Sequence, residues 1–119
     1  MDNKCEHHNG RNSCKVNPAE VFTLQDLVPY AEGAVISRTI VENAGGTVTA
    51  FSFAAGQGLS EHTAPFDAMV AILDGEAAIT ISGRQFTVTA GASIIMPAGA
   101  PHALKAITPF KMLLTMIRE

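Results

Sequence analysis

The sequence is poor in charged side chains and has no long hydrophobic run. Charged residues make up 16% of the 119 residues and hydrophobic residues 47%, whereas about 25% charged residues is usual in soluble domains. This composition excludes an intrinsically disordered chain, a collagen and a coiled coil. The longest apolar stretch is Ala68–Leu73, far shorter than the ~20 residues of a membrane-spanning helix. We therefore expect no membrane partner.

Several classes of partner and location are also disfavoured. The net charge is −3 and no basic stripe is present, so we expect no nucleic-acid partner. Residues 1–20 contain no apolar run that could serve as a secretory signal, and we expect a cytoplasmic protein. The low charge coverage predicts exposed apolar surface, and a homodimer interface is its natural cover.

The first 19 residues differ in composition from the rest. They are almost entirely polar, which predicts a flexible N-terminal tail over residues 1–19 and a single domain over residues 20–119. The tail contains four candidate zinc ligands: Cys5, His7, His8 and Cys14. The gap between the two cysteines is longer than in structural zinc sites, so a ligand-free tail is the favoured interpretation.

The pattern after Gly33 is that of many short strands. Alternating and β-branched segments are separated by Gly, Pro and Asp-Gly turn signals, which recur roughly every 8–12 residues. The expected strands are 35–41, 47–53, 62–64, 68–73, 77–81, 86–89, 93–96, 102–106 and 110–117. Because no long helical period is present, we predict an all-β antiparallel sandwich or barrel.

One stretch resembles the second conserved motif of the cupins. That motif has Gly, five residues, Pro, one residue, Gly, two residues, His, three residues and Asn. Gly91, Pro97, Gly99 and His102 fall in register with it, and Ala106 replaces the Asn. Pro fixes φ and Gly permits a backbone conformation that a Cβ would forbid, so this loop sets the orientation of His102.

The first cupin motif is present only in part. Counted back from Gly75, its metal ligands would fall at positions 62, 64 and 68, where this chain has His62, Ala64 and Ala68. The resemblance covers roughly residues 33–117. It implies an antiparallel double-sheet jelly-roll β-barrel of the small single-domain, RmlC-like cupin type.

The resemblance places two imidazoles in the barrel. If the strands that carry His62 and His102 both face inward, the rings converge in a mostly apolar cavity. With a third ligand they would hold a divalent metal such as Zn, Fe, Mn or Ni. Asp67 is the leading third candidate, ahead of Glu61 and Gln57. The alternative is that the two His side chains hydrogen-bond a ligand, or each other through water, without a metal.

Large apolar side chains are candidates for the rest of the pocket. Phe53, Met69 and Met112 are the expected ligand-binding residues beside the two His. Phe51, Met96 and Met116 could join them, although Met and Phe also fill barrel cores in general.

Three functions remain open from the sequence. The first is a binding module that holds a small ligand, such as a sugar-derived or aromatic metabolite. The second is a metal-dependent isomerase, lyase or dioxygenase that uses His62, His102 and Asp67. The third is a metal-free enzyme in which a His moves a proton.

Overall fold

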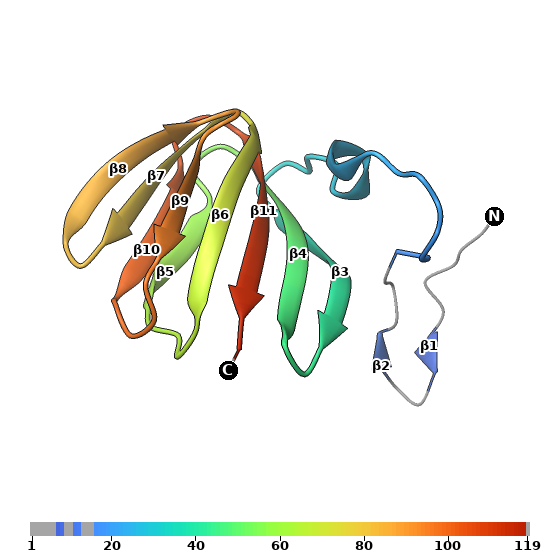
Figure 1. Ribbon diagram of the computed structural model, residues 1–119. Coiled ribbons are helices and arrows are strands. Elements are labelled where there is room, and N and C mark those ends of the chain that lie inside the picture. The colour runs from blue at the N-terminus through green and yellow to red at the C-terminus, as the bar shows by residue number, and fades with distance from the viewer. Residues whose placement is uncertain (1–6, 9–10, 13–15, 119) are drawn as a thin grey trace.

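The computed structural model describes residues 7–8, 11–12 and 16–118 (Figure 1). The elements, in chain order, are β1 (His7–His8), β2 (Arg11–Asn12), the 3-10 turn η1 (Leu24–Leu27), β3 (Val35–Asn43), β4 (Gly46–Phe53), β5 (Gly58–His62), β6 (Asp67–Asp74), β7 (Glu76–Ile81), β8 (Arg84–Thr89), β9 (Ser93–Met96), β10 (His102–Ala106) and β11 (Phe110–Ile117). None of the helical segments in this described part is long and apolar enough to span a membrane.

Nine of the described strands, β3 to β11, form two antiparallel sheets. One sheet has the order β5-β10-β7-β8, and the other has the order β3-β4-β11-β6-β9. Strands far apart in the chain are neighbours in both sheets, as β4 and β11 are in Figure 1. The predicted all-β jelly roll is thereby confirmed, and most expected strand limits lie within two residues of those observed.

The core lies between the sheets because the strands alternate apolar and polar side chains. On β6, Ala68, Val70 and Ile72 are buried against the opposite sheet. The rings of Phe53 and Phe110 stack at 4.4 Å between centroids. Phe53 ends β4 and Phe110 begins the neighbouring strand β11. Their fully buried rings thus close one end of the core.

The segment before β3 covers part of the outer face of the larger sheet. Val28 is fully buried there with Ile40 and Ala50, and Val16 packs against the same cluster. From this segment, Val16, Leu24, Leu27 and Val28 pack onto the larger sheet, and the limit between tail and domain at residues 19 and 20 stays a prediction. The predicted tail lies mostly outside the described residues, and so do Cys5 and Cys14. Within it, β1 pairs with β2.

Candidate functional site

His102 is delivered to the barrel interior by the loop before β10. Pro97 ends β9 and Gly99 has a φ of +79°, a left-handed conformation that favours glycine. The loop is fixed by hydrogen bonds from the Gly99 amide to the carbonyl of Ala64 and from the Ser82 amide to that of Pro101. His102 follows as the first residue of β10 and is only 5% exposed.

His62 reaches the same place through an irregularity in β5. In the pairing of β5 with β10, His102 lies opposite His62, and Leu104 lies opposite Leu59. Two steps along β10 therefore match three steps along β5. A bulge of this kind turns both Leu59 and His62 toward the interior, although strict alternation would place them on opposite faces. The ring of His62 lies at the exposed rim of the barrel.

The two imidazoles are in direct contact. Their Nε2 atoms lie 3.0 Å apart, and their ring centroids are 4.3 Å apart with the planes inclined at 70°. The structure thus brings together two side chains that are 40 positions apart in the sequence.

Backbone carbonyls occupy the other nitrogen of each ring. Nδ1 of His62 lies 2.7 Å from the carbonyl oxygen of Ser60, and Nδ1 of His102 lies 3.1 Å from that of Ala100. A carbonyl oxygen only accepts hydrogen bonds, so the tautomer that fits this geometry carries its proton on Nδ1. In the neutral rings both Nε2 atoms then hold lone pairs. A proton or another cation between them is required for an attractive contact.

A cavity of about 320 Å³ opens beside this pair, between the two sheets. Apart from the imidazoles, its wall is apolar. The lining residues are Phe51, Leu59, His62, Ala64, Phe66, Ala68, Met96, His102, Leu104, Met112, Leu114 and Met116. A concave, mainly apolar space with one convergent polar feature is the usual form of a small-molecule site.

Comparison with known proteins gives the family. The cupin domain profile matches residues 50–117, which is more than half of the chain. The chain belongs to the cupin family. No curated protein matched it.

Several solved structures are similar to this chain over most of its length. A conserved Streptococcus pyogenes protein of unknown function is 40% identical over 87% of this chain and 91% of its own, with a TM-score of 0.83. A cupin 2 conserved barrel domain protein from Leptotrichia buccalis is 39% identical over 82% of this chain and 47% of its own, with a TM-score of 0.79. A cupin superfamily protein from Desulfitobacterium hafniense is 27% identical over 87% and 95%, with a TM-score of 0.81.

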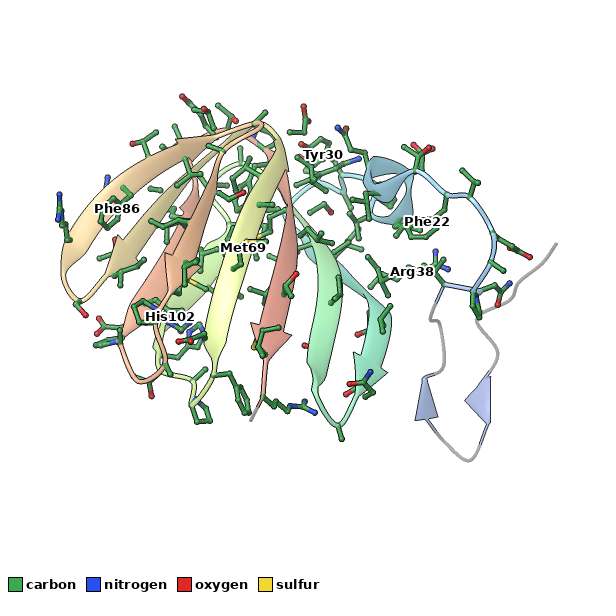
Figure 2. The ribbon with its side chains drawn as sticks, viewed as in Figure 1. Phe22, Tyr30, Arg38, Met69, Phe86 and His102 are labelled. Carbon is green, nitrogen blue, oxygen red and sulfur yellow. The ribbon has the colours of Figure 1, made fainter. Side chains whose placement is uncertain are left out.

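Only some of the predicted ligand-binding residues of this cupin line the cavity. Met112 lines the cavity with His62 and His102. Phe53 is fully buried and stacked on Phe110, so it supports the core and does not line the cavity. Met69, which was predicted to bind the ligand, does not line the cavity. It is 41% exposed, because alternation along β6 turns it away from the interior, and Figure 2 labels it on that strand.

Asp67 does not join the imidazoles. It precedes the inward-facing Ala68 by one residue, and alternation therefore turns it outward. Its Oδ1 accepts a hydrogen bond of 2.9 Å from the backbone amide of Ala98. Glu61 is also exposed.

The residues present do not fit a divalent metal site. In the described part of the chain, no cluster of three or more His, Cys, Asp or Glu side chains can hold a metal ion. Two neutral imidazoles without a carboxylate are too few ligands for Zn, Fe, Mn or Ni. The metal-dependent enzyme stays a prediction. Of its three expected metal ligands, this cupin brings together His62 and His102 but not Asp67.

Two cavity residues had no clear signal in the sequence. Leu59 is brought inward by the bulge in β5, which no residue pattern marks. Phe66 follows Pro65 in a short connection where no periodicity applies. By contrast, Leu104 shares a face with His102 by simple alternation, so the sequence pattern does predict its position.

Proposed function

We propose that this cupin is a binding module that holds a small, mainly apolar molecule in the cavity between its sheets. The polar end of that molecule contacts the Nε2 edge of the His62–His102 pair. The observation that carries the proposal is the combination of the apolar wall with one pair of hydrogen-bonding nitrogens.

The chemistry of the pair favours a hydroxyl-bearing ligand. With one shared proton, the pair offers one N–H donor and one nitrogen acceptor side by side. A hydroxyl group that inserts between the two nitrogens can accept a hydrogen bond from the protonated Nε2 and donate one to the other, in place of the hydrogen bond that the nitrogens share. An apolar body of the ligand would meanwhile cover Phe51, Leu104 and Met112 and displace water from them.

Thermal unfolding with benzyl alcohol as the probe tests this proposal. Benzyl alcohol combines an aromatic body with one hydroxyl. A ligand that binds the folded state raises the melting temperature as its concentration increases. We expect such a rise for the unmodified chain.

A matched pair of variants locates the binding. Ala68 lines the cavity on β6, whereas Ala71 of the same strand belongs to the outward-facing set. Ala68→Leu fills part of the cavity and should abolish the rise, and Ala71→Leu should preserve it. Equal rises in both variants, or no rise in the unmodified chain, would contradict binding in the cavity.

A further inference from the structure

A second cavity lies at the end of the barrel where β6 turns into β7. Residues 30–33 before β3 and residues 54–55 after β4 line it, together with Asp74 and Pro109. We call it the Tyr30 cavity. Its volume is about 700 Å³, within the ~300–1,000 Å³ that is usual for small-molecule sites.

This cavity is separate from the one between the sheets. The two share no lining residue. Strand β7 begins beside the Tyr30 cavity at Glu76 and ends at Ile81, which is the register partner of His102. The two cavities therefore lie toward opposite ends of β7, and Figure 2 shows Tyr30 and His102 toward opposite ends of the barrel.

Hydrogen bonds join the segments that form the wall of the Tyr30 cavity. The amide of Ala34 donates to the carbonyl of Ala31, and the amide of Ala54 donates to the carbonyl of Ala34. The hydroxyl of Tyr30 donates to Oδ2 of Asp74 at 2.5 Å. The cavity is thus formed before any ligand arrives, which lowers the entropy cost of binding.

The wall combines apolar surface with carboxylates. Methyl groups of three alanines, a proline ring and the ring of Tyr30 supply the apolar part, and Glu32 and Asp74 supply the carboxylates. A carboxylate has about four lone-pair sites, so Asp74 can accept further hydrogen bonds beside the one from Tyr30. Among the described residues, no Lys, Arg or His side chain lines this cavity.

One cation lies behind the wall. Lys111 is the register partner of Asp74, its Nζ lies 4.9 Å from the centre of the Tyr30 ring, and it donates a hydrogen bond of 2.7 Å to the carbonyl of Gln25. Its positive charge offsets one of the two carboxylates of Glu32 and Asp74. A single negative charge is left for a ligand, and the electron-rich ring also attracts a cation.

We propose that the Tyr30 cavity binds a small primary ammonium ion that carries an apolar body. The ammonium group has three N–H donors and points them at the carboxylates of Glu32 and Asp74. The body covers Ala55 and Pro109 and displaces water from them. This site does not depend on the binding of a ligand between the sheets. The competing explanation is a solvated hollow whose carboxylates contact only water.

An NMR titration of the full chain with 2-phenylethylammonium chloride distinguishes these explanations. We expect the amide signals of Gly33 and Ala55 to shift as the amine is added. Glu32→Gln should weaken binding by about two- to fivefold, the scale of one exposed ion pair. Glu61→Gln is the matched control, because it makes the same change of charge at an exposed site beside His62, and it should leave the affinity unchanged.

A probe of opposite charge isolates the role of the carboxylates. In 3-phenylpropanoate a carboxylate replaces the ammonium group, so we expect no shift at Gly33 or Ala55. The signals of Leu104 and Met112 report the cavity between the sheets, so the two sites are followed separately. Unshifted signals of Gly33 and Ala55 at high amine concentration, equal affinities in Glu32→Gln and Glu61→Gln, or equal binding of 3-phenylpropanoate would each overturn the proposal.

Discussion

The Nε2 atoms of His62 and His102 lie 3.0 Å apart while both Nδ1 atoms face backbone carbonyls. This arrangement determines where the ring protons lie. We predict one proton on Nδ1 of each ring, with any further proton between the two Nε2 atoms.

Nitrogen-15 NMR of the histidine rings tests this arrangement. We expect the Nδ1–H form for both His62 and His102 in the neutral state, because the carbonyls of Ser60 and Ala100 accept these protons. Long-range proton–nitrogen spectra distinguish the two tautomers, and His62→Gln and His102→Gln assign the signals. A ring with an unprotonated Nδ1 in the apo protein would contradict the arrangement.

Gly75, the glycine of the first cupin motif, has a steric role that Gly83 lacks. Gly75 and Gly83 both adopt left-handed φ values, +81° and +83°. A Cβ on Gly75 would collide with the carbonyl oxygen of Pro109 and would lie 2.9 Å from Cα of Phe110, whereas a Cβ on Gly83 would meet nothing within 4 Å.

Gly83→Ala should therefore cost about 1 kcal/mol of unfolding free energy, from the left-handed backbone alone. Gly75→Ala should cost about 3 kcal/mol or more, because overpacking against the backbone adds to the same strain. Urea unfolding measures both values. Equal losses in the two variants would show that the contact with Pro109 and Phe110 does not constrain this turn.

Tyr30 links the segment before β3 to the end of β6. Its hydroxyl donates a hydrogen bond of 2.5 Å to Oδ2 of Asp74, and Nζ of Lys111 lies 4.9 Å from the centre of its ring. Burial raises the pKa of Tyr30, and the hydrogen bond and negative charge of Asp74 raise it further. The folded state therefore holds the phenol proton more tightly than the unfolded state does.

This upward shift predicts a loss of stability in alkali. The contribution is fully present below the ordinary tyrosine pKa of about 10 and is lost as the pH rises toward the higher pKa of the folded state. Tyr30→Phe should make the unfolding free energy less dependent on pH above that point. Tyr30 is the only tyrosine, so tyrosinate absorbance reports it alone, and ionisation at the ordinary pKa would contradict the shift.

The expected homodimer has a candidate interface on the outer face of the larger sheet. One cross-strand row there consists of Val41, Val48, Thr115, Met69 and Ile95. It borders the part covered by Val16, Leu24, Leu27 and Val28, and its member Val48 packs against that cluster. The polar residues of the tail offer little to cover an apolar row, which favours a second copy of the chain.

We predict a sedimentation mass of twice 12.5 kDa at micromolar concentration. Ile95 is 61% exposed in this row, and Ile107 is 48% exposed outside it. Ile95→Lys should weaken self-association by about tenfold or more, as loss of a central interface residue does, and Ile107→Lys should not. A monomeric mass for the unmodified chain would reject the dimer, and an equal effect of both variants would reject this interface.

The sequence predicts the sheets well because alternation and turn residues act locally. Asp74-Gly75 connects β6 to β7, and the loop from Pro97 to Gly99 leads directly to His102. The meeting of His102 with His62 followed from the family motif. The direct Nε2 contact did not, since it depends on the irregular register of β5 against β10 within one sheet.

Other features of the site were beyond local patterns. The bulge that turns Leu59 and His62 to one side appears only in the pairing of β5 with β10. Met69 and Met96 are equally apolar. Met96 lines the cavity and Met69 does not, because their strands turn them to opposite faces of the sheet. The contact of Val16 with the outer face joins elements with no common periodicity.

The proposed binding cavity is tested most directly by a crystal structure of the chain grown with benzyl alcohol. We expect the aromatic ring between the two sheets, against Phe51 and Leu104. The hydroxyl oxygen should lie about 2.7–3.2 Å from Nε2 of His62 or His102. A cavity without benzyl alcohol at saturating concentration, or benzyl alcohol bound only elsewhere, would rule out this binding site.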